Sequence, residues 1–407
     1  MKIAIVGGGA GGLFLASLLP GATVFEGKDR VGKKLLVTGN GRCNLSNQDM
    51  DLGHFHGNKD LIQAVFQRAG QDQVLDHFNL LGLDTLADHR QRIYPRTLQA
   101  SSLVNILRRR VQENNQVFCQ REILAIRPEK KGFILRDQEG QEEFFHRVIL
   151  ATGGRAMPKS GSRGQGYKLA QSLGHTVTPT FPAIVQVKTQ DPFLNHLQGV
   201  KIEGLLEVHL DGEKLAQESG EILITNYGLS GPPVLDLSRR ANLAFREGKK
   251  VSFHFSLLNG SQDLDQVYTY VQERTYQYYH LSLEEFLEGL VHKKFIHVLA
   301  KSLDLSKETP LQDLAYQDLE RFWRLLAHYQ MDMTGAMGYD QAQVTCGGVS
   351  GLEVDETCQS KIHPGLYMIG ELLDVDGDCG GYNLQWAWSS AMACAQGILE
   401  KERQKRP

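Results

Sequence analysis

Three glycines near the start of the chain, Gly7, Gly9 and Gly12, have the G-x-G-x-x-G spacing of dinucleotide-binding turns. An apolar, β-branched run at 2–6 precedes them, and a helix-like run at 13–19 follows. In this context Gly7 permits a tight turn, Gly9 lets backbone approach a pyrophosphate, and Gly12 lets the helix pack closely on the strand. The pattern predicts a dinucleotide site at the helix N-terminus, although such a turn can also serve packing alone. The candidate contacts here are Gly7, Gly9, Ala10, Gly11 and Gly12.

Polar segments that follow this turn are suited to complete the site. A second strand is expected at 22–26, and Glu26 at its end can accept hydrogen bonds from ribose hydroxyls. The loop at 30–47 is rich in Gly, Lys, Arg and Asn, which suit phosphates and a polar ring. The run at 147–154 predicts a strand ending in small residues that let the chain pass close to a nucleotide. These segments add Glu26, Lys33, Lys34, Thr38, Gly39, Asn40, Gly41, Arg42, Cys43, Asn44, Thr152, Gly153 and Gly154 to the candidate cofactor contacts.

Near the C-terminus, "GELLDVDGDCGGYNLQWAW" allows three interpretations: a metal loop, an anion-binding turn, or a surface turn before a helix. Asp374, Asp376 and Asp378 alternate like the first three ligands of a calcium loop. However, Cys379 stands where that loop needs glycine, and Gln385 stands where it needs glutamate. We therefore expect no metal site here.

The residues after these acids have helical spacing. Leu384, Trp388, Ala391, Ala395 and Ile398 recur at intervals of four, three, four and three residues, which predicts one buried helix face. The glycines before this helix leave its positive N-terminus open to an anion. This favours the anion-binding interpretation and adds Gly370, Glu371, Asp374, Asp376, Gly380, Gly381, Tyr382 and Asn383 to the candidate cofactor contacts.

The composition is that of an ordinary globular chain. Its 407 residues, 41% of them hydrophobic, indicate about two to three domains. The net charge of −3 gives no global attraction to nucleic acid or to an anionic membrane. We recognise neither a secretory leader nor an apolar run long enough for a membrane helix. The six scattered cysteines include no C-x-x-C, which disfavours a disulfide framework or zinc ribbon and predicts a cytoplasmic protein.

Together these segments resemble the BaiN/aminoacetone-oxidase-type (RdsA-like) family of NAD(P)/FAD-dependent oxidoreductases. The similarity is carried, in the family's order and over nearly the whole chain, by "GGGAGG", "GKKLLVTGNGRCNLSN", "RIYP", "ATGG", "GSRGQGYKLAQSLGH", "GLSGP", "AQVTCGGV" and "GLYMIGELLDVDGDCGGYNLQWAWSS". The resemblance implies an α/β fold with FAD bound to a Rossmann-like domain of the glutathione-reductase type. It also implies NADH or NADPH as a transient reductant.

The resemblance further implies that a β-barrel-like insertion and a small helical domain interrupt the FAD-binding domain. The middle of the chain supports this independently, because strand-like runs at 182–189, 205–210, 221–226 and 250–257 precede a helical pattern at 263–328. The expected domains are a discontinuous FAD-binding domain at 1–190 and 340–407, a β-barrel-like domain at 191–260 and 329–339, and a helical domain at 261–328.

The resulting hypothesis is an FAD-dependent oxidoreductase in which NAD(P)H reduces the flavin and hydride passes to an electron-poor C=C bond. One alternative is an enzyme that reduces uridine to dihydrouridine in ribosomal RNA, and another is a non-catalytic flavin-binding module. The expected substrate is thus a small molecule or an RNA base, and no membrane partner is expected. The sequence identifies no proton donor; the candidates for contact in the catalytic site are Arg42, Asn44, Tyr94 and Tyr382.

Two further groups of polar residues remain open to interpretation. His54 and His56 alternate with phenylalanine, which fits a surface pair or a substrate loop, and no further ligands for a metal are evident. Arg92, Tyr94 and Arg96 combine arginine with an aromatic ring, as nucleic-acid sites do. Solvated loop residues are the alternative for this group.

Overall fold

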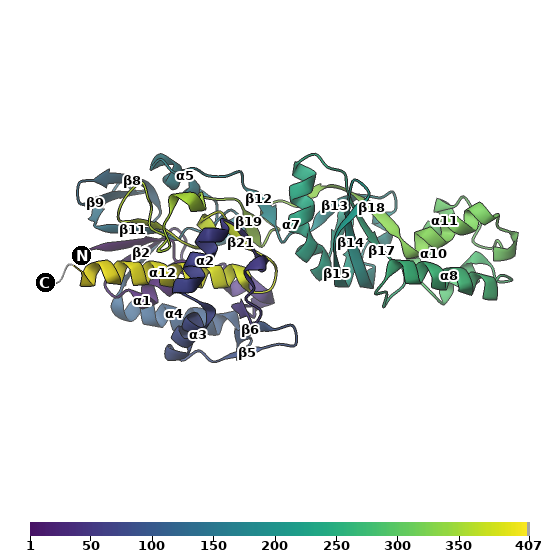
Figure 1. Ribbon diagram of the computed structural model, residues 1–407, viewed down its shortest axis with the longest axis horizontal. Helices are drawn as coiled ribbons and strands as arrows, with labels where there is room; N and C mark the ends of the chain where they lie inside the picture. Colours follow the sequence, from purple (N-terminus) through teal and green to yellow (C-terminus); the bar gives the residue numbers. More distant parts are fainter. Residues whose placement is uncertain (405–407) are drawn as a thin grey trace. The chain divides into compact units, whose positions relative to one another are not determined.

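The computed structural model describes residues 1–404, which fall into two compact units. Unit 1 consists of Met1–Pro182 together with the chain from Tyr339 onward, and unit 2 is Ala183–Gly338 (Figure 1). The division expected from the sequence separates a helical domain from the barrel within the middle of the chain. That separation stays a prediction.

A parallel sheet of five strands forms the centre of unit 1. The strand order is β20-β11-β1-β2-β7, and every neighbouring pair is parallel. Apolar side chains fill the middle strands, and β1 is buried at all four positions, as expected where both faces are covered. The strands are β1 (Ile3–Val6), β2 (Ala22–Glu26), β7 (Gln116–Cys119), β11 (Arg147–Leu150) and β20 (Leu366–Met368).

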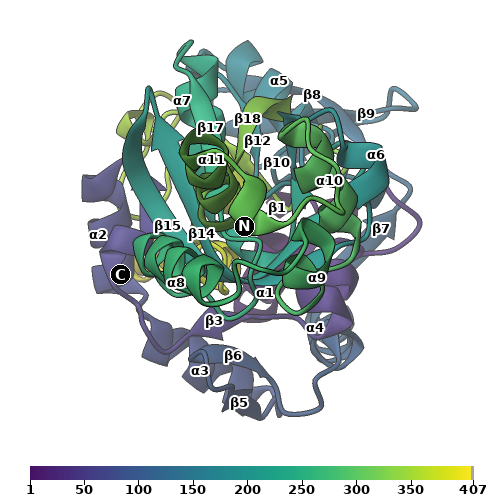
Figure 2. The same ribbon diagram turned by 90° about the vertical axis from the view of Figure 1, so that its right-hand side faces the viewer.

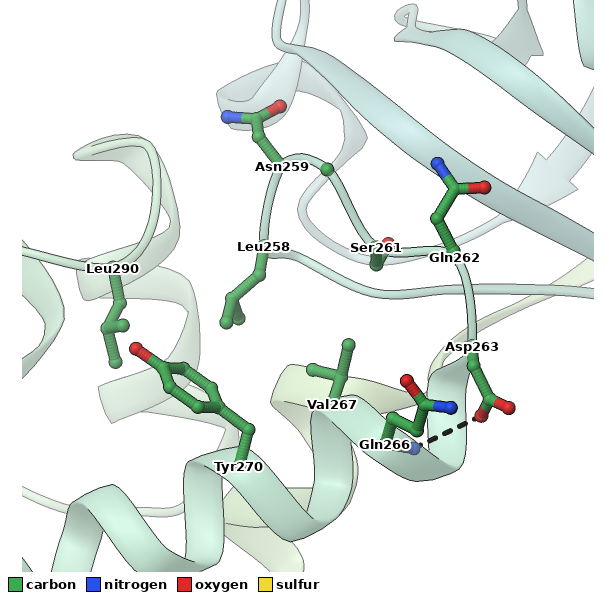
Figure 3. A pocket seen from close by; sticks show the side chains of 10 residues that line it. Leu258, Asn259, Ser261, Gln262, Asp263, Gln266, Val267, Tyr270 and Leu290 are labelled. Atoms are coloured by element: carbon green, nitrogen blue, oxygen red, sulfur yellow. Dashed lines mark hydrogen bonds between the residues drawn. The ribbon is translucent and has the colours of Figure 1, made fainter.

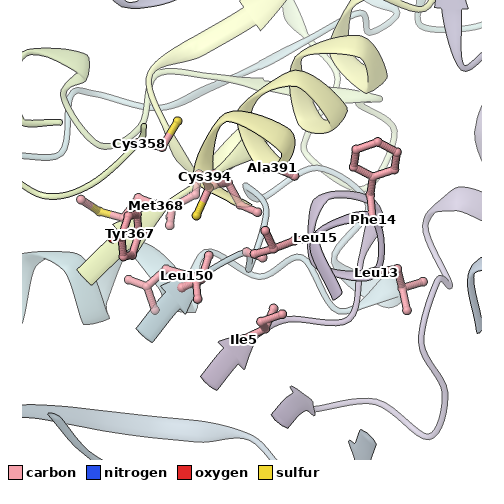
Figure 4. Packing of buried hydrophobic residues seen from close by; sticks show 14 of the residues in the cluster. Ile5, Leu13, Phe14, Leu15, Leu150, Cys358, Tyr367, Met368, Ala391 and Cys394 are labelled. Carbon is pink, nitrogen blue, oxygen red and sulfur yellow. The ribbon is translucent and has the colours of Figure 1, made fainter. Parts of the chain in front are cut away.

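Helix α12 (Tyr382–Arg403) packs against α1 (Ala10–Leu18) in unit 1 (Figure 1). The predicted C-terminal helix is confirmed, but it is buried on more than the one predicted face. Every residue from 385 to 395 is buried, and Figure 4 shows Ala391 and Cys394 among the apolar side chains of this core. The fully buried amide of Gln385 donates to Ser389 Oγ at 2.9 Å, so its burial is compensated.

Smaller elements of unit 1 surround the parallel sheet. Three antiparallel strands form one additional sheet, and two shorter sheets bring distant segments together. The three-stranded sheet contains β8 (Ile123–Glu129), β9 (Gly132–Asp137) and β10 (Glu142–Phe145), the second contains β3 (Ser46–Asn47), β6 (Arg92–Pro95) and β5 (Thr85–Ala87), and the third pairs β4 (Phe55–Gly57) with β21 (Val375–Gly377). The remaining elements are α2 (Lys59–Arg68), α3 (Gln71–Leu80), α4 (Ala100–Asn114), α5 (Gln165–Ser172) and β19 (Val344–Cys346), with β12 (Phe181–Ala183) at the boundary of the units.

A closed barrel forms the core of unit 2, in the order β13-β16-β15-β14-β17-β18. Leu206 and Val208 of β14 belong to the buried apolar cluster, and they alternate with the polar Glu207 as a strand requires. The predicted β-barrel is confirmed. Its strands are β13 (Val187–Gln190), β14 (Lys201–Leu210), β15 (Glu213–Ile224), β16 (Gly228–Ser230), β17 (Val251–Phe255) and β18 (Tyr329–Ala336).

Helices complete unit 2. The helical pattern predicted for 263–328 is confirmed, and α8 packs against α11 (Figure 2). The buried Trp323 ring of α11 donates from Nε1 to Thr275 Oγ1 of α8 at 3.0 Å. The helices are α6 (Leu194–Leu197), α7 (Pro232–Arg246), α8 (Leu264–Gln277), α9 (Leu283–Glu288), α10 (Lys294–Ser302) and α11 (Tyr316–Ala327).

Candidate functional site

The glycine turn at the start of α1 combines crowded positions with an open one. Gly7 has a left-handed φ of +109°, and a Cβ on it would lie 2.4 Å from the Ala151 carbonyl oxygen. A Cβ on Gly12 would lie 1.9 Å from the Gly7 carbonyl oxygen. By contrast, a Cβ on Gly9 would meet nothing within 4 Å. Gly7 and Gly12 therefore allow close packing, while Gly9 leaves the N-terminus of α1 accessible to a ligand.

Glu26 ends β2 beside this turn. Its carboxylate accepts the Gly8 N–H at 3.0 Å and the Lys28 N–H at 2.8 Å. Burial raises the pKa of Glu26, and these hydrogen bonds offset only part of the rise. Each carboxylate oxygen keeps a second acceptor position, which is what a ribose hydroxyl needs.

Two lysines of the following loop are held by carboxylates. Lys33 pairs with Asp29, and Lys34 Nζ lies 2.6 Å from Glu371 Oε2. Glu371 Oε1 also accepts the Thr345 N–H at 2.9 Å. The sequence suggested phosphate contacts for both lysines. In the structure each lysine already has an acidic partner, and the Lys34 pair joins the N-terminal loop to the C-terminal segment.

The next turn has an unusual backbone. Gly39, Asn40 and Gly41 are three consecutive residues with positive φ. The Cys43 N–H donates to the Thr38 carbonyl oxygen at 3.0 Å and closes the turn. The Cys43 side chain is fully buried, and burial raises its pKa to about 12, so its thiol stays protonated. Any contact of Cys43 with a ligand would therefore come from its backbone.

The N-terminus of α12 meets this turn at Asn44. A Cβ on Gly381 would lie 2.3 Å from the Ser46 carbonyl oxygen and 2.8 Å from Asn44 Oδ1. Asn44 Oδ1 is buried and has no hydrogen-bond partner among the described residues. An unsatisfied buried acceptor costs about 1–3 kcal/mol. The amide oxygen therefore offers a position for an N–H or O–H of a bound ligand.

Small residues follow β11, as the sequence predicted. Gly153 has a φ of +68°, and a Cβ on Gly154 would lie 2.5 Å from Thr345 Oγ1. Thr152 Oγ1 lies against Gly166, and it is a second buried oxygen without a hydrogen-bond partner among residues 1–404. The end of β11 thus packs closely on neighbouring segments of unit 1, and only Gly allows this approach at position 154.

The aspartates of the C-terminal segment have partners inside unit 1. Asp374 Oδ2 accepts from Thr178 Oγ1 at 3.0 Å, and Asp376 Oδ2 accepts from the Cys346 thiol at 3.2 Å. Asp376 is only 2% exposed. Contacts from these carboxylates to a cofactor would therefore use acceptor positions that the internal donors leave open.

Gly370, Gly380 and Asn383 shape the chain on either side of β21. Gly370 and Gly380 have left-handed φ values of +66° and +136°. The Gly380 carbonyl oxygen accepts from Asn47 Nδ2 at 3.0 Å. Asn383 donates to the Gly377 carbonyl oxygen at 2.7 Å and accepts the Gly377 N–H at 2.9 Å. These bonds fix the position at which α12 begins.

The candidate tyrosines are buried rather than open. Tyr94 is 9% exposed and Tyr382 is 4% exposed. Burial raises the pKa of both phenols, that of Tyr382 to about 12, so both stay protonated near neutral pH. The Arg92 charge acts on both rings, and the exposed Arg42 also acts on Tyr94. The four residues predicted to line the catalytic site therefore lie in one region of unit 1, near the N-terminus of α12.

The structure adds Asp378 to this region, a residue that the sequence had linked only to a rejected metal loop. His54 Nδ1 lies 3.1 Å from Asp378 Oδ2, and His56 Nε2 lies 2.8 Å from Asp378 Oδ1. The His54 ring stacks on Tyr382, with centroids 4.4 Å apart. Pairing of β4 with β21 brings the histidines to the aspartate. No sequence pattern predicts this pairing, because the two strands are more than 300 residues apart.

A cavity of about 580 Å³ lies in unit 2, between the 258–262 loop and α8 (Figure 3). Its lining includes Leu258, Val267 and Tyr270, and it contains none of the residues predicted for the cofactor site. Within residues 1–404, no group of three or more His, Cys, Asp or Glu side chains is arranged to hold a metal ion. Among the described helices, none combines the length and apolar character needed to cross a membrane.

The parallel sheet, with a glycine turn between its first strand and α1, defines a Rossmann-type FAD-binding fold. This confirms the fold class predicted from the sequence. The model of the HI0933-like protein Rossmann domain matches residues 1–397, and the chain belongs to that family.

Two relatives and one solved structure are similar to the chain. It is 36% identical to the 3-dehydro-bile acid delta(4,6)-reductase of Clostridium scindens, over 98% of this chain and 99% of that protein. It is 31% identical to the ribosomal RNA dihydrouridine synthase of Escherichia coli, over 97% of both chains. The 3-ketosteroid delta1-dehydrogenase of Sterolibacterium denitrificans superposes with a TM-score of 0.52 at 13% identity, covering 98% of this chain and 99% of that chain. That last likeness concerns the fold, and the relatives confirm the predicted class, an oxidoreductase.

Proposed function

We propose that this protein binds FAD and uses NAD(P)H to reduce it, and that hydride then passes to an electron-poor C=C bond of a small molecule. The observation that carries the proposal is a pair of glycine turns at helix N-termini, one with open space at Gly9 and one with the unpartnered oxygen of Asn44. The delta(4,6)-reductase relative supports reduction of a conjugated double bond.

The residues at both turns fit this cofactor. The Gly7–Gly12 turn would hold the pyrophosphate at the N-terminus of α1, and Glu26 would accept from the ribose. Asn44 and the N-terminus of α12 at Gly381 would contact the flavin ring. When bound, FAD supplies the hydride carrier of the reaction.

The chain itself supplies orientation and charge stabilisation. The positive end of α12 favours negative charge beside Gly381, which would stabilise a reduced, anionic ring. The Lys34–Glu371 pair holds the N-terminal loop against the C-terminal segment. It would thereby help to fix the distance between the two glycine turns. Tyr94 and Tyr382 are buried, and beside a bound flavin ring they would limit the access of water.

Two measurements test the proposal in sequence. Protein purified with an FAD supplement should be yellow and retain the cofactor after gel filtration. Stopped-flow mixing with NADH, and separately with NADPH, should bleach the flavin absorbance with at least one of them. A colourless protein that takes up no FAD contradicts the whole proposal. Retention of FAD without reduction by either nucleotide would instead favour a non-catalytic flavin-binding module.

Reduction of uridine in ribosomal RNA is the second candidate function. The 31% identical relative is named for this reaction, and Arg90 and Arg96 are exposed around the strand that carries Tyr94. Exposed arginines suit contacts with the phosphates of an RNA chain. The reduced enzyme should be mixed with ribosomal RNA and, in parallel, with a 3-dehydro-Δ4,6 bile acid. Dihydrouridine formed with RNA would favour this candidate, and turnover of the enone alone would remove it.

A further inference from the structure

We propose that His54 donates the proton to the substrate during its reduction, and that Asp378 and His56 are the residues that position His54. This inference rests on the proposed function and identifies a group that the sequence left unassigned. The two histidines of β4 and its N-terminal flank bind opposite oxygens of one carboxylate, at 3.1 Å and 2.8 Å.

The geometry around His54 favours an imidazolium. Its Nδ1 faces Asp378 Oδ2 at 3.1 Å, and its Nε2 faces Asp49 Oδ2 at 3.3 Å. A carboxylate oxygen can only accept a hydrogen bond, so a neutral ring would turn a lone pair toward one of the two acids. Burial alone would lower the pKa of His54, but the hydrogen bonds to Asp378 and Asp49 outweigh it and raise the pKa. The ring is therefore charged at the pH at which a free histidine begins to lose its proton.

The two hydrogen bonds to His54 differ in length and in how exposed the acidic partner is. Asp378 is 30% exposed and is also held by His56, and its own N–H donates to the His54 carbonyl oxygen at 2.9 Å. Asp49 is 51% exposed and makes the longer contact. A substrate can therefore displace Asp49 from Nε2 while Nδ1 stays anchored. The transferable proton is the one on Nε2.

The position of the ring connects it to the proposed cofactor site. His54 stacks on Tyr382 with an interplanar angle of 18°, and Tyr382 is the first residue of α12 after Gly381. The imidazole therefore contacts the first side chain of the helix whose N-terminus would face the flavin. A side-chain exposure of 33% also lets solvent reach it.

The proton balance is simple. Bound reduced FAD would supply hydride to one alkene carbon, and the His54 Nε2–H bond would break as a C–H bond forms at the other carbon. The substrate would gain two hydrogens at the expense of the reduced cofactor, and the imidazole would become neutral with its Nδ1–H still on Asp378. Solvent then restores the proton on Nε2.

The pH dependence follows from the groups around the ring. Transfer to substrate needs the imidazolium, so the rate of flavin reoxidation should fall as pH rises through the pKa of His54. Substitution of Asp378 should move this decline to lower pH, because the carboxylate no longer favours the charged ring. The titratable and charged groups around His54 are Asp49, Asp51, His56, Lys59, Asp378 and Tyr382, with Arg92 acting on Tyr382.

The first test needs no substrate. Nitrogen-15 NMR of histidine rings in the full chain would follow the titration of His54, whose signals are assigned by their loss in His54→Gln. The pKa should lie above the ordinary histidine value in the wild type and fall in Asp378→Asn. His209→Gln in unit 2 is the matched control and should leave the titration of His54 unchanged. His209 was chosen because its Nε2 also pairs with a carboxylate, that of Glu207, at 2.8 Å. A His54 titration that is unchanged in Asp378→Asn would overturn the positioning role.

The second test separates this inference from the proposed function. FAD content and flavin bleaching by NAD(P)H should stay at wild-type levels in His54→Gln and Asp378→Asn, because neither step uses this proton. Reoxidation of the reduced flavin by the acceptor that the wild type prefers should slow at least about tenfold in His54→Gln and lose its pH dependence. His209→Gln should match the wild type. If reoxidation by His54→Gln keeps the wild-type rate and pH profile, His54 is not the donor. A wild type that lacks FAD, or cannot be reduced, is a failure of the proposed function, and the NMR result still stands on its own.

Discussion

Both glycine turns of the proposed cofactor site precede a helix, but they are stabilised in different ways. At α1 the closest approach is local, because Gly12 meets the carbonyl oxygen of Gly7 in the same turn, and Gly7 in addition meets the distant Ala151 carbonyl oxygen. At α12 it is tertiary, because Gly381 meets Ser46 and Asn44 from a segment more than 300 residues away. The first turn thus has its closest contact within its own sequence, whereas the contacts that crowd the second turn come only from a distant segment. Substitutions at the two turns should therefore fail in different ways.

Gly12→Val should have the largest effect on the fold. Its Cβ would lie 1.9 Å from a backbone oxygen, and neither α1 nor β1 can move without disturbing the central sheet. We expect a loss of about 4 kcal/mol or more in the free energy of unfolding, enough to prevent accumulation of folded protein. Circular dichroism and thermal melting check this. A variant that melts with the wild type would show that the α1 turn is not constrained by packing.

Gly381→Ala should have the next largest effect. The new Cβ would lie 2.3 Å from the Ser46 oxygen, and φ is +105°, so the N-terminus of α12 must shift away from Asn44. We expect a destabilisation of about 2–4 kcal/mol and weaker FAD binding, measured by denaturant unfolding and flavin titration. Gly248→Ala is the control, because Gly248 has a φ of +82° but no neighbour within 4 Å and should lose only about 1–2 kcal/mol. Equal losses in the two variants would argue against crowding at Gly381.

The carboxylates beside the two turns should respond to pH with opposite signs. The pKa of Glu26 is raised by burial, so stability should fall as pH rises from about 4.5 through its folded pKa. Burial alone would also raise the pKa of Asp378, but hydrogen bonds from His56 and His54 lower it overall. Its contribution should therefore be present above the ordinary aspartate pKa and be lost as pH falls through the folded pKa.

Glu26→Gln and Asp378→Asn separate these two contributions. Each change should lower stability at neutral pH by about 1–2 kcal/mol through lost hydrogen bonds, and each should remove its own slope from the curve of stability against pH. Urea unfolding between pH 3.5 and 7 would measure both curves. Identical changes in slope for the two variants would mean that the two carboxylates do not differ as described.

The same contrast explains what the sequence could predict. The Gly7–Gly12 turn, β1 and β2 follow from local spacing, as do the helical segments of unit 2, because each pattern covers a few neighbouring residues. The face of α12 was predicted too narrowly, since Gln385 and Ser389 satisfy each other inside the core. Helix α7 was missed, as was the short barrel strand β16, whereas the segment of β18 was assigned to the barrel by the expected domain boundaries. Strand β16 has only three residues, which is too short for an alternating pattern to show.

The candidate site shows the same contrast between local patterns and tertiary contacts. Residue types suited to a cofactor were recognisable, but their partners were not. Lys34 was expected on a phosphate, and its contact with Glu371 joins opposite ends of the chain. The His54–Asp378 pair depends on the register of β4 with β21. Such contacts arise from tertiary folding, and a single sequence carries no local signal for them.

The smallest expected effect on stability comes from Gly9→Val, and it tests the central claim most directly. Gly9 has an extended backbone and open space around it, so the folded protein should melt within about 0.5 kcal/mol of the wild type. Gly338→Val in unit 2 is the matched control, because Gly338 also has no neighbour within 4 Å and no positive φ. The decisive measurement is FAD affinity of the two variants by flavin fluorescence titration. We predict wild-type affinity for Gly338→Val and a loss of at least about tenfold, or 1.4 kcal/mol, for Gly9→Val. A folded Gly9→Val protein that binds FAD as tightly as the wild type would contradict the cofactor site described here.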